Sequence, residues 1–234
     1  MTLTFRDWQE RLRDPSLTAL LVLEVTVIFV MSPLRALGVV VPPTIAVTVV
    51  LGVITVVVLL SRSKGATVLV LASVALNVTG VLMHLANPST FTDVLSAVGE
   101  VLARCALGWV VAVAVFAPGH ITHYRIQGAV VLYLNFALIF TALYGLLLEV
   151  APGAFIGPAT ALNEAGSGAT ITYFSLSTLT TGGFGDIVPV HPFARSLANL
   201  EAIIGQLYPA TLLARIVTME LEHRRRRSEP TDHG

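Results

Sequence analysis

Long runs of apolar residues, mostly free of ionisable side chains, recur along this chain. A helix needs about 20 such residues to cross the hydrocarbon core of a bilayer, which is about 30 Å thick. Hydrophobic residues make up 55% of the 234 residues and charged residues only 12%. That balance lies outside the range of ordinary soluble domains. The sequence therefore predicts an all-α membrane protein.

Six segments have the length and composition of a membrane-spanning helix. Asp14 is a cap candidate for the first segment, and Pro15 suits its first turn. Pro42 and Pro43 open the second segment in the same way. The six predicted spans are residues 15–31, 42–60, 66–86, 94–117, 128–148 and 193–221.

The basic residues predict the orientation of these spans, because Lys and Arg are retained on the cytoplasmic side. If the N-terminus is inside, only Arg35 and Arg195 fall outside. We therefore expect a multi-pass protein of the cell membrane with both termini in the cytoplasm. The basic residues on the expected cytoplasmic side are Arg6, Arg11, Arg13, Arg62, Lys64, Arg125 and the run Arg224, Arg225, Arg226, Arg227.

The connection between the fifth and sixth spans contains a short helical segment followed by glycines. Residues 169–180 would form a helix of about half the membrane thickness at 1.5 Å per residue. Ser167 is a candidate for its cap. Glycine-rich backbone at membrane depth is tolerated only where it is buried in protein or lines a water-filled cavity. We therefore predict a reentrant segment whose glycines expose backbone carbonyls.

The residues Thr181-Gly182-Gly183-Phe184-Gly185, followed by Asp186, resemble the selectivity filter of potassium channels, Thr-Val-Gly-Tyr-Gly. Residues 173–180 resemble the pore helix of that superfamily, and residues 194–217 resemble the inner helix of its bacterial members. The resemblance implies a homotetramer around a central pore. It further implies that potassium ions in the filter are held by the carbonyls of residues 181–184 and by the threonine hydroxyl, with Gly185 completing the extracellular end.

Two positions depart from the family pattern. Phe184 replaces the usual Tyr and lacks its hydroxyl group. Gly182 replaces the usual Val or Ile, and glycine costs roughly 0.5–1 kcal/mol of backbone order at each site. The resemblance predicts passive, potassium-selective conduction, and Gly182 keeps open the alternative of a weakly selective or non-selective cation channel.

Residues beside the filter complete the predicted site. We assign Thr180 to filter support and Glu164 and Asp186 to the outer mouth. From Glu149 to Asp186 the sequence contains acidic residues but no Lys or Arg. An acidic mouth concentrates cations, although ordinary solubility of a loop is an alternative explanation.

The resemblance divides the chain into five parts. The first four spans would form a peripheral domain in the place of a voltage sensor. The expected parts are a cytoplasmic N-terminus at 1–14, the four-helix domain at 15–117, a cytoplasmic linker at 118–127, the pore domain at 128–221 and a basic cytoplasmic tail at 222–234.

The sixth span contains Gly205 and Pro209, both of which weaken a helix. We interpret them as a candidate gate hinge, and a permanent kink or close helix packing at the glycine remains an alternative. Glu201 in the same span would have a buried partner behind the filter or pair with Arg195.

The fourth span has one basic residue, Arg104, whereas a voltage sensor needs several. We therefore expect little intrinsic voltage dependence. Glu24, Asn77 and Arg104 lie at similar predicted depth, so we hypothesise a buried pair of Glu24 with Arg104, assisted by Asn77. Glu100, one turn from Arg104, is the competing partner.

Other classes of protein fit less well. The histidines are scattered and no catalytic motif is present, so we expect no enzyme. A secondary transporter remains an alternative because broken helices occur in transporters, although normally in both halves of the chain. We expect no cofactor, no metal other than potassium and no nucleic-acid partner. Arg224, Arg225, Arg226 and Arg227 would bind anionic lipid or act as a topology anchor.

Overall fold

The protein is mainly helical. The computed structural model describes residues 17–37, 52–55, 63–116, 123–157 and 167–228. Within these ranges, four helices are long and apolar enough to cross a membrane: Leu17–Leu34, Lys64–Ala86, Thr90–Phe116 and Arg125–Val150. They confirm the prediction of a helical membrane protein. The predicted second span, 42–60, lies outside the described residues except for 52–55, and the other five predicted spans are helical.

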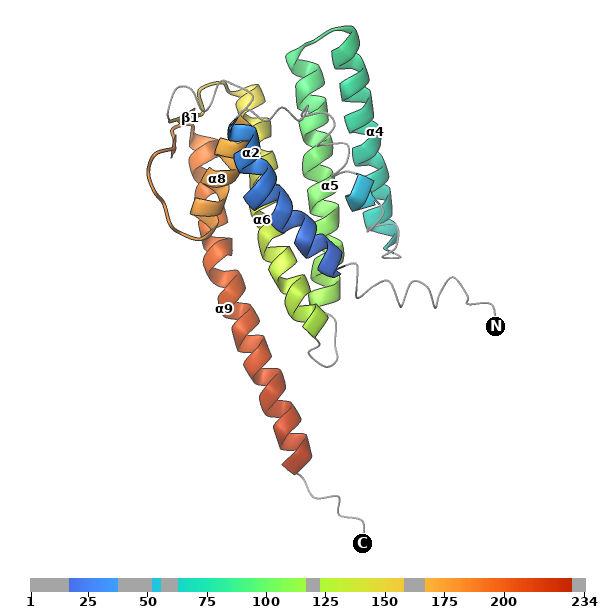
Figure 1. Cartoon of the computed structure of the whole chain (residues 1–234), viewed down its shortest axis with the longest axis vertical. Coiled ribbons are helices and arrows are strands. Elements are labelled where there is room, and N and C mark those ends of the chain that lie inside the picture. The colour runs from blue at the N-terminus through green and yellow to red at the C-terminus, as the bar shows by residue number, and fades with distance from the viewer. Residues whose placement is uncertain (1–16, 38–51, 56–62, 117–122, 158–166, 229–234) are drawn as a thin grey trace, which may run out of the picture.

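The elements follow one another as Figure 1 shows. Residues 17–26 form a helix that continues through a π-helical turn into a short α-helix. The two strands of a small sheet lie before and after α8 in the chain. The elements are η1 (Val27–Met31), α2 (Ser32–Ala36), α4 (Lys64–Ala86), α5 (Thr90–Phe116), α6 (His123–Val150), β1 (Phe155–Ile156), α8 (Ser167–Leu179), β2 (Val188–Pro189) and α9 (Pro192–Ser228).

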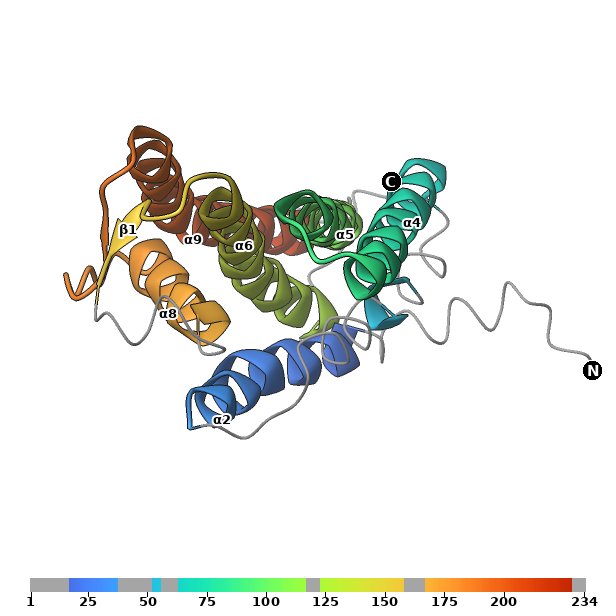
Figure 2. The same ribbon diagram turned by 90° about the horizontal axis from the view of Figure 1, so that it is seen from above.

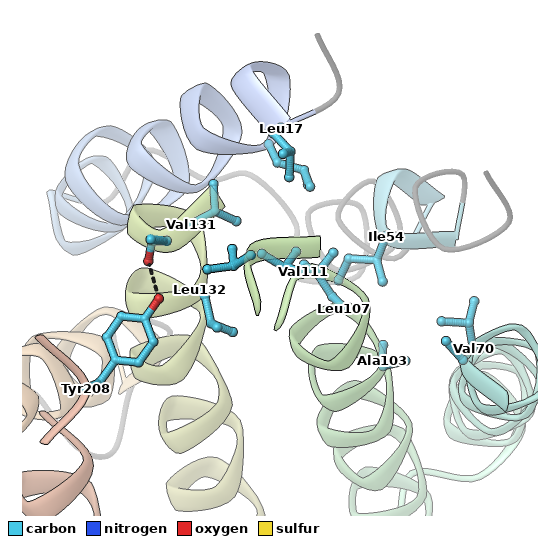
Figure 3. Packing of buried hydrophobic residues seen from close by; sticks show 14 residues of the cluster. Leu17, Ile54, Val70, Ala103, Leu107, Val111, Val131, Leu132 and Tyr208 are labelled. Atoms are coloured by element: carbon cyan, nitrogen blue, oxygen red, sulfur yellow. Dashed lines mark hydrogen bonds between the residues drawn. The ribbon is translucent and has the colours of Figure 1, made fainter. Parts of the chain in front are cut away.

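Helix α6 lies at the centre of the arrangement. In Figure 2, α4 and α5 lie on one side of it and α8 lies on the other, whereas α9 begins on the side of α8 and runs behind α6 toward α5. The first core cluster joins these two halves, because it includes Val111 of α5, Leu132 of α6 and Tyr208 of α9 (Figure 3). Helix α5 therefore packs directly on α6, the outer helix of the predicted pore domain, and α4 packs on α5.

Helices α4 and α5 approach each other closely at two glycines. A Cβ atom added to Gly99 of α5 would lie 2.8 Å from the carbonyl oxygen of Ser73 and 3.0 Å from the amide nitrogen of Asn77. A Cβ atom added to Gly80 of α4 would lie 2.3 Å from the Oγ atom of Ser96. Small residues let helix backbones pack closely in membranes, where van der Waals contact is a main source of association.

A second core cluster holds the outer end of α6 against α8 and α9. It is rich in aromatic side chains, and the ring of Tyr144 makes edge contacts with Phe155 and Phe174 at centroid distances of 5.4 and 5.2 Å. Strand β1 pairs antiparallel with β2, with Phe155 opposite Pro189. This pairing ties the chain after α6 to the chain that leads into α9.

We predict that Gly99→Ala destabilises the α4–α5 pair, because the added methyl group would overlap the backbone of α4. Overpacking of this kind costs about 1–3 kcal/mol. The matched control is Gly65→Ala, where an added Cβ meets nothing within 4 Å. The thermal unfolding midpoint of the detergent-solubilised protein should fall for Gly99→Ala and stay level or rise for Gly65→Ala. Equal midpoints for both variants would contradict the close contact.

Candidate functional site

The half-length helix α8 leads directly into the glycine-rich segment. It spans Ser167–Leu179, close to the predicted 169–180. Its last carbonyl groups are satisfied by the segment that follows: the amides of Gly182 and Gly183 donate to the carbonyl oxygen of Ser177 at 2.7 and 3.2 Å. The amide of Thr181 donates to Thr178 at 2.9 Å. The terminal carbonyls of a helix otherwise lack partners, so these bonds fix how the segment leaves the helix.

Backbone angles alternate in sign along the segment. Thr181, Gly183 and Gly185 have φ angles of 57°, 50° and 80°, whereas Gly182 and Phe184 between them are not at positive φ. Alternation of left-handed and right-handed residues turns successive peptide groups to one side of the chain, as in the anion-binding nests formed by backbone amides. The same alternation can present a row of carbonyl oxygens, which is what a dehydrated cation requires.

The strained residue in this segment is Thr181. A β-branched residue at positive φ is an outlier, and such strain costs about 1–3 kcal/mol. It persists only where the surroundings over-determine the backbone. Here the Thr181 amide is bonded to α8, and its hydroxyl accepts a hydrogen bond from Nε2 of Gln206 at 3.3 Å.

The side chains of the segment lie against one face of α8. The ring of Phe184 stacks on the ring of Tyr173 with centroids 5.7 Å apart and an interplanar angle of 12°. The side chain of Asp186 lies near the Tyr173 hydroxyl. Stacking thus orients residue 184 without the hydroxyl group that Tyr would supply.

In the single chain, residues 181–186 are exposed, and the side chain of Phe184 is 71% exposed. The segment is anchored at its far end by Ile187, which is buried in the second core cluster. Glu164, which the sequence assigned to the outer mouth, lies outside the described residues. Thr180 is described, and its hydroxyl donates to the carbonyl of Leu176 at 2.7 Å, within the last turn of α8.

Gly182 has room for a side chain. A Cβ atom at this position would lie 3.5 Å from the carbonyl oxygen of Ser177, 3.7 Å from Oγ1 of Thr180 and 3.8 Å from the ring of Phe184. These are ordinary van der Waals distances. Since Gly182 is also not at positive φ, neither the backbone angle nor space within the chain requires glycine here.

Gly205 lets α9 approach the end of α8. A Cβ atom added to Gly205 would lie 1.8 Å from the carbonyl oxygen of Leu179, a distance that no side chain tolerates. The same carbonyl accepts a hydrogen bond from the hydroxyl of Tyr133 at 3.4 Å. The structure therefore gives Gly205 the close-packing role that the sequence analysis kept as an alternative.

Pro209 lies within α9, and the helix continues through it. Proline has no N–H to donate to the residue four positions earlier, which is Gly205. The backbone bond that would tie residue 209 to residue 205 is therefore missing just below the contact with α8. A hinge between Gly205 and Pro209 stays a prediction. In such a hinge, Gly205 would stay packed against α8 while the helix after Pro209 moves.

Glu201 connects three helices. Its carboxylate is fully buried and accepts hydrogen bonds from the hydroxyl of Tyr144 in α6, at 2.6 Å, and from the hydroxyl of Ser175 in α8. The Ser175 hydroxyl also lies 2.7 Å from the carbonyl oxygen of Ala137. Of the two partners considered from the sequence, Arg195 does not pair with Glu201 but donates to the carbonyl of Pro189. The observed partner in α8 belongs to the helix that leads into the glycine-rich segment.

Sequence reasoning did not identify Tyr144, Ser175 or Gln206. An ionisable residue in an apolar span signals that donors must lie nearby. Glu201 therefore indicated that hydrogen-bond donors lie nearby, but not which residues they are. Tyr144 and Ser175 are ordinary core residues in their own segments, and only the packing of three helices brings them together.

The predicted polar cluster of the peripheral domain forms only in part. Glu24 is 2% exposed, and within the described part of the chain neither of its carboxylate oxygens has a hydrogen-bond partner. Nη2 of Arg104 lies 3.8 Å from Oε1 of Glu100, which the sequence analysis named as the competing partner. Among the described residues, Arg104 makes no direct ion pair with Glu24, but its guanidinium is close enough to interact electrostatically with the Glu24 carboxyl. The buried pair stays a prediction. Asn77 does not join this cluster, because its Nδ2 atom donates to the carbonyl oxygen of Ser96 in α5 at 3.5 Å.

Comparison with known proteins places an ion-channel domain in this region. Residues 128–222, less than half of the chain, match the family model described as "Ion channel". No curated protein and no solved structure matches the chain significantly. The match covers α6, α8, the glycine-rich segment and most of α9. It supports ion channel activity in a membrane protein, and it indicates a channel rather than an enzyme.

We predict that Tyr144→Phe weakens the connection of α6 to α9, because it leaves the buried carboxylate of Glu201 with one donor fewer. Such a loss costs about 1–3 kcal/mol or more for a charged group. The matched control is Tyr133→Phe in the same helix, whose hydroxyl forms a longer, partly buried bond. The unfolding midpoint should fall clearly more for Tyr144→Phe. Equal losses would show that the bond to Glu201 contributes nothing beyond an ordinary hydroxyl.

Proposed function

We propose that this protein is a homotetrameric channel that conducts potassium ions passively through a filter formed by residues 181–185. The observation that carries the proposal is the alternation of φ along this segment. The segment directly follows a half-length helix, inside the region that matches ion channels. Thr181, Gly182, Gly183 and Phe184 supply the coordinating carbonyls, Thr181 adds its hydroxyl, and Gly185 completes the outer end.

The physical basis is replacement of the hydration shell. A cation that leaves water loses its coordinating oxygens, and rings of backbone carbonyls restore them without a charged side chain. The C-terminal end of α8 carries the negative end of the helix dipole, which favours a cation beyond it. Asp186 at the outer end adds a negative charge that concentrates cations at the mouth.

The geometry of one chain supports assembly with further copies. A single segment supplies carbonyls on one side of an ion only, so a complete coordination shell needs further copies of the same segment. In the isolated chain, residues 181–186 are exposed, and so is the apolar ring of Phe184. Such exposure at membrane depth supports identical subunits as the partners that enclose the ions.

The orientation in the cell membrane rests on the basic residues. Figure 1 places the starts of α4 and α6 on the same side of the molecule as the end of α9. Lys64 and Arg125 therefore lie on the side toward which the arginine run of the tail points, which supports cytoplasmic termini. In this orientation, the tail arginines face the anionic surface of the inner leaflet.

A non-selective cation channel is the second candidate. The observation in its favour is the space beside Gly182, where the filter lacks the packing that a β-branched residue would supply. Repeated in four subunits, a loss of roughly 0.5–1 kcal/mol of backbone order per site would loosen the filter.

We predict a reversal potential close to the potassium equilibrium potential for the purified full chain in planar bilayers, with K⁺ on one side and Na⁺ on the other. The filter carbonyls would replace the hydration shell of K⁺ more completely than that of Na⁺. A reversal potential near zero with current present would refute selectivity and favour the second candidate. Absence of current across applied potentials, pH values and lipid compositions would refute conduction.

We predict further that Gly182→Ala is tolerated and stiffens the filter, because the added methyl group meets only ordinary contacts. The K⁺/Na⁺ permeability ratio should be maintained or increased. The matched variant is Gly183→Ala, at a φ of 50°, where a side chain strains the backbone, so its conductance should fall strongly. An equal loss of current in both variants would show that Gly182 also needs glycine.

A further inference from the structure

Gln206 is the residue of α9 that touches the glycine-rich segment with its side chain. Its Nε2 atom lies 3.3 Å from Oγ1 of Thr181, and both residues are exposed in the single chain. Thr181 is the first residue of the segment and carries the strained φ of 57°. The contact therefore meets the filter at its inner end, at the one residue whose side chain is also a proposed ion ligand.

The position of Gln206 is set by buried contacts on the same helix. Glu201 is bonded to Ser175, and Gly205 lies against Leu179, as described above. One turn further on, the Tyr208 hydroxyl donates to the carbonyl of Ala129 at 2.9 Å (Figure 3). Residues spaced by four and three lie on one face of a helix. That face is docked, so the rotation of α9 that presents Gln206 to the filter is fixed by the core.

The chemistry of the contact affects ion coordination. A hydroxyl oxygen has two lone pairs and one hydrogen to donate. When the Gln206 amide donates to one lone pair of Thr181, the hydroxyl is held in one rotamer with the other lone pair available to a cation. The same amide group carries a second neutral oxygen, Oε1, and oxygen ligands without a formal charge suit a partly dehydrated monovalent cation.

We propose that Gln206 is a specificity-determining residue, which positions the Thr181 hydroxyl at the inner end of the filter and offers its own amide oxygen to the entering cation. The inference rests on the proposed function and goes beyond it, since it assigns part of the selectivity to the inner helix. It also explains why the strain at Thr181 is retained: contacts from α8 and from α9 hold this residue from two sides.

The test compares Gln206→Leu with wild type in planar bilayers, with K⁺ and Na⁺ on opposite sides. Leu has a similar size but neither the donor nor the oxygen. The K⁺/Na⁺ permeability ratio should fall roughly two- to tenfold, as expected for loss of one hydrogen bond at the ion site. Gln127→Leu is the matched control. Gln127 lies near the start of α6 and accepts a hydrogen bond from the Thr18 hydroxyl, so its replacement should leave the ratio unchanged.

Gln206→Glu serves as a second variant in case Gln206→Leu does not assemble. Glu keeps an oxygen but, when ionised, has no hydrogen to donate. Its ratio should therefore also differ from that of wild type. In a Thr181→Ala background, where the hydroxyl is absent, the effect of Gln206→Leu should shrink, because the two residues act together.

The outcomes separate the inference from the proposed function. A potassium-selective wild type with unchanged ratios in the conducting Gln206 variants would overturn the inference and leave the function standing. A lower unfolding midpoint without a change in ratio would also overturn it, since it would assign Gln206 a structural role only. A wild type that does not discriminate K⁺ from Na⁺ would overturn the proposed selectivity and the inference together.

Discussion

The site depends on how the carbonyl groups in the last turn of α8 find hydrogen-bond donors. A helix that stops at membrane depth leaves its last carbonyls without intrahelical partners, and each would be costly in hydrocarbon. Here the carbonyl of Ser177 accepts from Gly182 and Gly183, and that of Leu179 accepts from Tyr133. The segment that satisfies the helix end is thus the segment proposed to hold ions. Its shape is a consequence of how the helix ends.

Helix α9 is held against the end of α8 by contacts that tolerate little change. Gly205 brings its backbone against Leu179, and Glu201 reaches Ser175 and Tyr144 one turn earlier. Burial of a carboxylate is expensive, and two hydroxyl donors offset only part of that cost. Buried polar contacts of this kind specify one arrangement of helices more than they add stability, which is the role that we ascribe to Glu201 in joining α6, α8 and α9.

The sequence predicted the helices well, because spans and the half-length helix are encoded in local hydropathy and length. The glycine-rich pattern did not indicate which residues of the segment have a positive φ. Gly183 and Gly185 are at positive φ, but the third such residue is Thr181 and not Gly182. The amide of Thr181 donates to the carbonyl of Thr178, and its hydroxyl accepts from Gln206 of α9. The second contact is tertiary, and no local pattern reveals it. The residue types alone therefore did not predict which residues of the segment adopt a left-handed backbone conformation.

The polar residues of the peripheral domain show the same limit. Counting residues along each span predicts depth but not the rotation of a helix about its own axis. Asn77 faces Ser96 and packs against Gly99, whereas Arg104 lies near Glu100. Equal depth was therefore not enough to bring Glu24 and Arg104 into a direct ion pair. The same argument explains Gln206, whose direction is set by residues 201, 205 and 208 and not by its own neighbours in sequence.

The account depends on one claim, that residues 181–185 from several chains face one another around a common axis and bind cations there. Single-particle cryo-electron microscopy of the full chain in lipid nanodiscs with potassium tests it most directly. We predict a four-fold symmetric assembly with a row of density on the axis, at the level of the carbonyls of residues 181–184. A glycine-rich segment that lies away from any symmetry axis, or an assembly without four-fold symmetry, would contradict the account.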